Sequence, residues 1–298
     1  MNYLVRSSSD EMHHGPFALD EADRFAGMVS QTDKAKLFLD LHHQGGPLLM
    51  PNPWDEGSAR LLASLGFAAL ATTSGGFAAT LGRLDYHVTR EEALASAARI
   101  AASVEVPVSV DLEDGYADDP AGVAVTVEGA VAAGLAGCSV EDFTRDRDAP
   151  IYDVDLAAAR VEAAAEVAHR GPVRLVLTAR AENYLNGRQD LADTITRLQR
   201  YQEAGADVLY APGMTNLDEI RSVVDSVDRP VNVLAMRGGP PVADLEAAGV
   251  RRISVGGAFA YAALGAVVAA AQELRDRGTY GYLEQVKVGV TAARSAFG

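Results

Sequence analysis

The sequence predicts a (β/α)8 barrel, and three observations lead to that prediction. Short apolar runs alternate with Ala-rich amphipathic segments in eight successive units from about residue 47 onward. The phrases that join the units repeat, as in SLGFAAL, AAGLAGCSV, EAGADVLY and EAAGVRRISV, and each is typical of a helix end, a Gly stop and a buried strand. Strands that alternate with helices of this size form a parallel sheet. Eight such units within about 250 residues match a closed barrel.

The predicted elements follow these runs in order. The strands are predicted at 48–50, 68–72, 106–110, 137–140, 173–178, 208–210, 231–234 and 252–255. Helices are predicted at 32–43, 55–65, 90–103, 120–133, 155–169, 190–204, 216–225, 241–248 and 259–277. Asp55 and Ser58 are typical of a helix start, and turn or helix-cap roles are predicted for Asp114, Asp118, Asp119 and Asp142. An open doubly wound sheet is the alternative, but LLMPNPWD stands where a Gly-rich dinucleotide turn would follow the first strand.

Length and composition exclude several classes of protein. The chain has 298 residues, 48% of them hydrophobic, one Cys and a formal net charge of −15. It can bury a large core, which excludes intrinsic disorder, and it cannot form an internal disulfide. The acidic balance argues against a nucleic-acid partner or an anionic membrane surface, because a protein that binds either one needs clustered Lys and Arg. We expect a cytoplasmic protein, because the sequence has no secretory signal and no apolar run of the ~18 residues that a membrane span needs.

A single domain is predicted for most of the chain. Residues 1–30 are Ser-rich and lack clear periodicity, which favours a loosely ordered segment. Residues 31–298 are predicted to form one barrel with a C-terminal helical extension. The tail after residue 277, GTYGYLEQVKVGVTAARSAFG, is too apolar to lie free in solvent, so we expect it to pack on a neighbouring subunit of a homo-oligomer.

Polar side chains cluster at the predicted carboxyl ends of the strands, where barrel enzymes carry their active sites. Asp111 and Glu113 share a face of the third strand because they are two residues apart, and Glu141 follows the next strand. A hard divalent cation, Mg²⁺ or Mn²⁺, would relieve the repulsion among these carboxylates. Arg180 follows the fifth strand and is a candidate clamp for the carboxylate of a small anionic substrate. The other candidate substrate-binding residues are Asn232 on the seventh strand and the turn Thr73, Ser74 and Gly75, whose N–H groups can face an oxyanion.

Four motifs, in this order and spacing, make the chain similar to the isocitrate lyase/phosphoenolpyruvate mutase superfamily. The motifs are PNPWDEGSARLLASLGFAALATTSGGFAATLGRLD, PVSVDLEDGYADDP, GCSVEDF and VLTARAENYL. The resemblance implies a (β/α)8 barrel that is usually a homotetramer, often with a C-terminal helix exchanged between subunits. It also implies Mg²⁺ and an α-oxo- or α-hydroxycarboxylate substrate, in which a C–C or P–C bond is cleaved or formed.

The resemblance further implies roles for individual residues. The family's acidic motif falls on residues 111–117, with Glu113 in place of its second Asp and Ala117 in place of its last Gly. The Asp of the family's LGxxD motif falls on Asp85, near the metal. The implied metal-binding set is Asp85, Asp111, Glu113 and Glu141, and the implied catalytic set is Arg180, Glu113 and Glu141.

The loop that follows Glu141 and Asp142 departs from the family pattern. It is FTRDRDAPIYD and lacks a Lys/Arg-Cys-Gly-His motif, so isocitrate and methylisocitrate lyase activities are not expected. Our first hypothesis is a Mg²⁺-dependent lyase that acts on a small 2-oxo or 2-hydroxy carboxylate through a metal-stabilised enolate. Its general acid stays open among Tyr210, Glu182 and His87. The alternatives are a P–C bond mutase or hydrolase, a carboxylate-binding homologue without turnover, and a phosphate-binding barrel that uses residues 237–239 and 256–257.

Overall fold

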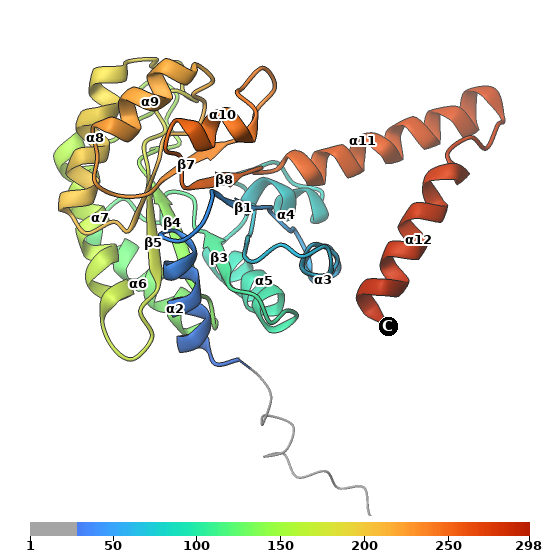
Figure 1. The fold of residues 1–298 in the computed structure, drawn as a ribbon, viewed down its shortest axis with the longest axis horizontal. Helices are drawn as coiled ribbons and strands as arrows, with labels where there is room; N and C mark the ends of the chain where they lie inside the picture. Colours follow the sequence, from blue (N-terminus) through green and yellow to red (C-terminus); the bar gives the residue numbers. More distant parts are fainter. Residues whose placement is uncertain (1–28) are drawn as a thin grey trace, which may run out of the picture.

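The computed structural model describes residues 29–298 and confirms the predicted barrel of parallel strands with helices outside it (Figure 1). Paired neighbours follow the order β1-β8-β7-β6-β5-β4-β3-β2. The strands are β1 (Leu48–Met50), β2 (Leu70–Ala71), β3 (Val108–Asp111), β4 (Gly137–Glu141), β5 (Val176–Arg180), β6 (Val208–Tyr210), β7 (Val231–Leu234) and β8 (Arg252–Ser254). The segment predicted to be loosely ordered, 1–30, lies almost wholly outside the described residues.

Single contacts close the ring between β1 and β2. The N–H of Ala71 donates to the carbonyl of Pro51 at 3.2 Å. The buried Asn52 side chain donates to the carbonyl of Thr72 and accepts from two N–H groups that follow β8. One amide therefore ties the carboxyl ends of β8, β1 and β2 together, at the end of the barrel where the active site is predicted.

Three of the predicted site residues are the last residues of their strands. Asp111 ends β3, Glu141 ends β4 and Arg180 ends β5, so each strand extends one or two residues beyond its predicted end. The start of β3 also moves, to Val108, because the preceding Pro107 has no N–H to give to the ladder. The two carboxylates and the guanidinium are therefore carried by hydrogen-bonded strands and not by loops.

The outer helices lie close to their predicted positions, with one addition. They are α2 (Gln31–Leu41), α3 (Glu56–Ser64), α4 (Ser74–Thr80), α5 (Arg90–Ala102), α6 (Pro120–Ala132), α7 (Val154–His169), α8 (Leu191–Glu203), α9 (Leu217–Asp225) and α10 (Val242–Ala247). Asp55 and Asp119 cap α3 and α6, as their positions predict. The short α4 is not predicted, because its Ser-Gly-Gly start is typical of a turn. The hydroxyl of Thr73 accepts from the N–H of Gly76, so the predicted turn is the start of this helix.

Helix α2 closes the barrel at the end opposite the predicted active site. Phe38 is fully buried and packs with Ala136, Val176 and Val208 from the amino-terminal ends of the strands. The buried ammonium group of Lys34 donates to the carbonyl of Val104 at 2.7 Å. Packed side chains fill this end, and the cavity described below opens at the carboxyl ends of the strands.

The C-terminal arm leaves the barrel. Helix α11 (Ala258–Gln272) projects outward, and α12 (Leu283–Phe297) turns back toward α3 (Figure 1). The predicted single helix over 259–277 is wrong in detail, because α11 gives way to a π-helical turn, η1 (Glu273–Arg277), that ends at Gly278 with φ 62°. Large apolar side chains are exposed along the arm, among them Phe259, Tyr261, Leu264, Val267, Val268, Val286 and Val288. No helix within residues 29–298 has the length and apolar character to cross a bilayer.

Candidate active site

A cavity of about 200 Å³ opens at the carboxyl ends of the strands and reaches into the barrel. Most of the predicted site residues line it, namely Thr73, Ser74, Asp85, Asp111, Arg180 and Asn232. Gly75, Glu113 and Glu141 lie behind its wall and contact the residues that line it. Gly256 and Gly257 also line the cavity, whereas Arg237 is exposed away from it. The cavity therefore brings the acidic set and the predicted substrate-binding set to one place.

Arg180 is surrounded by carboxylates. Its Nη1 lies 3.0 Å from Asp111 Oδ1, its Nη2 lies 2.9 Å from Glu141 Oε2, and its Nε lies 2.8 Å from Glu182 Oε1. Burial opposes the charge of this guanidinium, but the three carboxylates outweigh burial and hold its pKa well above the ordinary value. A substrate carboxylate would have to compete with these partners, so Arg180 is less free to act as a clamp than its position in the sequence suggests.

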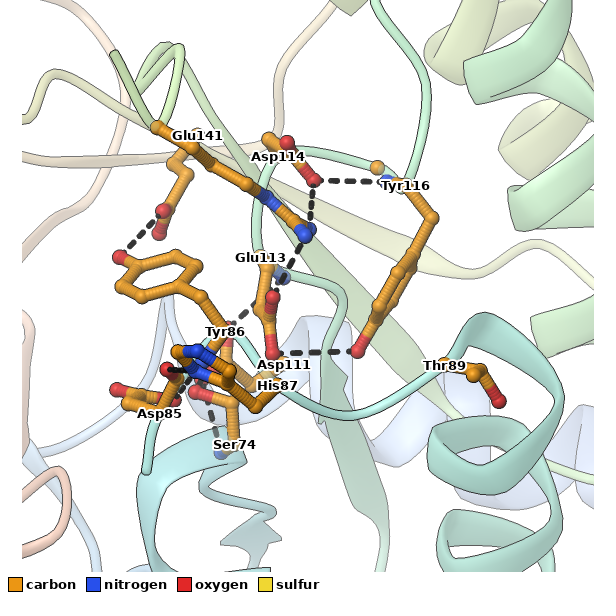
Figure 2. A network of polar contacts seen from close by, with 12 residues as sticks. Ser74, Asp85, Tyr86, His87, Thr89, Asp111, Glu113, Asp114, Tyr116 and Glu141 are labelled. Atoms are coloured by element: carbon orange, nitrogen blue, oxygen red, sulfur yellow. Dashed lines mark hydrogen bonds and ion pairs between the residues drawn. The ribbon is translucent and has the colours of Figure 1, made fainter. Parts of the chain in front are cut away.

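A second arginine covers the acidic cluster. Arg145, in the loop after β4, lies 3.0 Å from Glu113 Oε2 and 2.6 Å from Asp114 Oδ1. Its guanidinium carbon is 5.5 Å from the ring centres of both Tyr86 and Tyr116, which is a cation–π distance. Figure 2 shows the two tyrosines on either side of Glu113. Arg145 thereby joins the loop after β4 to the residues that follow β3.

Backbone strain is concentrated in the same cluster. Among residues 29–298, the non-glycine residues with positive φ are Tyr86 (62°), Glu113 (50°), Tyr116 (54°) and Arg145 (65°). Arg145 contacts each of the other three, and the Tyr116 hydroxyl also donates to Glu113 Oε1. Such conformations cost about 1–3 kcal/mol each and persist where the surroundings enforce them, most often at functional sites. This concentration of strain makes the cluster a candidate functional site, independently of the charges.

Ser74 and Gly75 hold two aspartates side by side. The N–H and hydroxyl of Ser74 both donate to Asp111 Oδ2, at 3.2 and 3.0 Å. Burial, followed by the charge of Asp111, raises the pKa of Asp85, and the Ser74 side chain partly offsets this rise. A Cβ at Gly75 would lie 3.0 Å from Asp85 Oδ2, so a larger residue would push Asp85 out of place. Figure 2 shows Ser74 between the two carboxylates.

The acidic residues outnumber their cationic partners, and their pKa values respond. Burial, followed by the charge of Asp111, raises the pKa of Glu113 to about 8 despite the nearby Arg145. Burial also raises the pKa of Glu141 well above its ordinary value despite Arg180. An oxygen-only donor set with this excess of negative charge suits a hard divalent cation. Within residues 29–298 no three acidic, His or Cys side chains lie close enough together to bind a metal directly, so bridging waters would complete its shell.

Tyr86 is a candidate proton donor that sequence reasoning missed. Its hydroxyl donates to Glu141 Oε1 at 2.8 Å, and its side chain lines the cavity. Burial, followed by the charge of Glu141, raises the pKa of Tyr86, so the hydroxyl keeps its proton at neutral pH. Of the three residues considered from the sequence, Tyr210 and Glu182 also line the cavity, whereas His87 is exposed. The available signal was position, because Tyr86 directly follows Asp85.

Asp142 and Asn232 make contacts that the sequence did not predict. Asp142 is buried and caps no helix, because its carboxylate contacts Arg197 and the Tyr201 hydroxyl, at 3.2 and 2.5 Å, and accepts the N–H of Glu182. It therefore fixes the end of β4 against α8. Asn232 lines the cavity, and both ends of its amide are engaged within the barrel wall.

Comparison with known proteins adds to this geometry. The family model for phosphoenolpyruvate phosphomutase matches residues 38–275. A Mycobacterium tuberculosis protein is 37% identical over 241 residues, which cover 80% of this chain and 89% of the relative. The oxaloacetate decarboxylase of Paraburkholderia xenovorans is 33% identical over 200 residues, 64% of each chain. A Burkholderia cenocepacia crystal structure, provisionally described as a lyase/mutase, is 48% identical with a TM-score of 0.83, covering 85% of this chain and 92% of that one.

Proposed function

Because the chain belongs to the phosphoenolpyruvate phosphomutase family, we propose that it is a Mg²⁺-dependent lyase that cleaves or forms a C–C bond in a small 2-oxo or 2-hydroxy carboxylate. The observation that carries this proposal is the strained acidic cluster at the cavity, in which Asp85 and Asp111 are held together with an excess of negative charge. The relative that acts on oxaloacetate supports the choice of C–C chemistry and of a small oxo acid.

Asp85, Asp111, Glu113 and Glu141 would hold the cation, partly through water. When bound, Mg²⁺ polarises substrate oxygens and offsets the negative charge that develops as the bond breaks. Arg180 holds Asp111 and Glu141 in place beside the cavity, because it contacts both within 3.0 Å. The acidic residues therefore depend on one guanidinium for their arrangement.

Proton transfer is assigned to Tyr86. Its hydroxyl donates to Glu141 Oε1 and its side chain lines the cavity, so the tyrosine can give its proton to the enolate of the substrate and become a phenolate, which takes a proton back from water after the product leaves. Arg145 lies over the ring of Tyr86 and would stabilise the phenolate formed for that moment. The loop after β4 is anchored to the residues that follow β3, because Arg145 pairs with Glu113 and Asp114.

The test is a turnover assay by NMR with Mg²⁺ and with EDTA. The panel contains oxaloacetate, 2-oxoglutarate, malate-type and citrate-type acids, and phosphonopyruvate. Metal-dependent loss of one carboxylic acid is expected, and Asp111→Asn should lower that rate about 100-fold or more. Asp193→Asn is the matched control, because Asp193 also pairs with an arginine, Arg197, but outside the cavity. A phosphorus product from phosphonopyruvate alone would replace this proposal with P–C chemistry, and binding without any turnover would replace it with a silent homologue.

We also propose that the arm packs on another copy of the chain, in a dimer or a tetramer. The supporting observation is that α11 buries only Ala260, while Val267 and Val268 are 64% and 54% exposed. An apolar helix without a covering surface is unfavourable in water. Light scattering after size exclusion should give a multiple of 31.3 kDa, and Val267→Glu should lower the mass. Val125→Glu, at a similarly exposed valine on α6, should leave the mass unchanged. A monomeric wild-type protein would contradict the proposal.

A further inference from the structure

A further arginine, Arg252, faces the cavity from inside the barrel. Arg252 is the first residue of β8, is 3% exposed and lines the cavity. Its Nε donates to Asn232 Oδ1 and its Nη2 donates to Thr178 Oγ1, both at 3.0 Å, and its Nη1 lies 3.2 Å from His42 Nε2. Among residues 29–298 no carboxylate pairs with this guanidinium. A buried positive charge therefore borders the cavity without a counter-ion from the described part of the chain.

The partners of Arg252 are neutral and fixed in orientation. His42 Nδ1 lies 2.7 Å from the carbonyl of Phe38, so Nδ1 carries the proton and Nε2 is left as the acceptor. Burial, followed by the charge of Arg252, lowers the pKa of His42 to about 3, which keeps the ring neutral. Asn232 donates through Nδ2 to Ser254 Oγ at 2.9 Å, which turns its Oδ1 toward Arg252. These contacts position the guanidinium and leave its charge uncompensated.

Arg252 also lies at a defined depth relative to the acidic cluster. In the strand register Arg180 pairs with Tyr210, Tyr210 with Asn232, and Asn232 with Arg252. Arg180 is the last residue of β5 and Arg252 is the first residue of β8, so this row descends from the mouth of the barrel into its interior. The guanidinium of Arg180 lies 5.3 Å from the ring centre of Tyr210, and all four side chains line the cavity. The cavity is thus acidic at its mouth and positive at its floor.

A charge buried without a counter-ion is unfavourable, and a small anion from solution would offset it. Burial lowers the pKa of Arg252 to about 9, which leaves the group charged at neutral pH. A carboxylate suits this place because a guanidinium can still donate from the N–H groups that its three partners leave free. The hydroxyls of Ser109 and Ser139 line the same cavity and can donate as well.

We propose that Arg252 binds a second, distal carboxylate of the substrate, so that the protein selects small dicarboxylates over the matching monocarboxylates. This inference rests on the proposed function for the assignment of a carboxylate substrate. It assigns the reacting end of the substrate to the acidic mouth and the far end to the floor of the barrel. Asn232, His42 and Thr178 are positioning residues for Arg252 in this arrangement.

The test compares pairs of acids that differ only in the distal carboxylate. Malate is paired with 2-hydroxybutyrate, and 2-oxoglutarate is paired with 2-oxopentanoate, in calorimetric titrations with Mg²⁺ and with EDTA. Wild-type protein should bind at least one diacid about 10- to 100-fold more tightly than its monoacid. Arg252→Gln should remove that preference while monoacid affinity is unchanged, and Arg252→Lys should restore part of it. The ratio does not depend on turnover, so a failure of the proposed reaction remains distinguishable from a failure of this subsite.

Arg251→Gln is the matched control, because Arg251 precedes Arg252 and donates to the carbonyl of His42 without lining the cavity. It should leave the ratio unchanged. Absence of any diacid preference in the wild-type protein, or an equal loss of both acids in Arg252→Gln, would overturn the proposal. A direct measurement needs no variant: crystals soaked in bromide should show an anomalous peak beside the Arg252 guanidinium. Absence of an anomalous bromide peak beside Arg252 would also contradict the proposed subsite.

Discussion

Arg180 and Arg252 lie in one register row of the barrel, yet their surroundings are opposite. Arg180 contacts Asp111, Glu141 and Glu182, each within 3.0 Å. Arg252 contacts an amide oxygen, a hydroxyl and a neutral imidazole. The same type of side chain therefore organises an acidic cluster at one position and presents an unpaired charge at the other. In this barrel, therefore, the neighbouring side chains decide whether a buried guanidinium is neutralised, and its depth does not.

The three carboxylates around Arg180 bear on the role expected of it. Its position after the fifth strand suggested a clamp for the substrate carboxylate, and that role stays a prediction. Each nitrogen of its guanidinium already contacts a carboxylate of the protein, however, so its first contribution is to hold those carboxylates in place. Arg252 has the unused charge that a substrate anion requires.

The largest expected effect separates the two arginines by stability. Arg180→Gln leaves three carboxylates, two of them buried, without their cation and should lower the free energy of unfolding by about 3–5 kcal/mol. Arg252→Gln removes a buried charge whose partners are neutral, so its effect should stay within about 1 kcal/mol of zero. Urea unfolding at pH 7 measures both. Equal losses of stability in the two variants would show that the partners of each guanidinium do not decide its contribution to stability.

A smaller effect tests whether the acidic end is the reacting end. Tyr86→Phe removes the hydroxyl that lies between the cavity and Glu141, and it should lower kcat about 100-fold with little change in KM. Tyr152→Phe is the control, because the Tyr152 hydroxyl also donates to a carboxylate, that of Asp118, away from the cavity. Full activity in the Tyr86 variant would move proton transfer to another group.

Sequence reasoning predicted the parts of this molecule that depend on local pattern. The eight strand–helix units follow from periodicity and Gly stops, and Asp111, Glu141 and Arg180 follow from being at strand ends. The contact between Tyr86 and Arg145 does not follow from such a pattern, because it joins two residues with left-handed backbone conformations from separate loops. Local pattern does not report such strain in non-glycine residues.

The role of Arg252 was equally hidden, for a different reason. It stands in the apolar run RRISV, where an arginine at the start of a strand is typical of a solvated end. Its contacts are with Asn232 and with His42, which is 210 positions away in the chain, so only the closed barrel brings them together. The start of α4 at Thr73 was missed because its Ser-Gly-Gly sequence has low helix propensity. Tertiary contacts, and not local preference, decide both positions.

The smallest effect concerns Asp207, a buried acid on the outer base of the barrel whose charge is compensated. Burial alone would raise its pKa, but hydrogen bonds from His169, Arg174 and the N–H of Leu177 lower it below the ordinary value of 3.8. A depressed pKa in the folded state stabilises the protein above pH 4 and ceases to do so as the pH falls through the folded-state value. Asp207→Asn should therefore cost about 1–2 kcal/mol at pH 7 and less at pH 3, by urea unfolding at both pH values. Glu128→Gln, in an exposed pair with Arg170, should change stability by less than about 0.5 kcal/mol at either pH. A cost for Asp207→Asn that is the same at pH 7 and pH 3 would mean that packing, and not charge, holds this residue, and the rule drawn from the two arginines would not extend beyond the cavity.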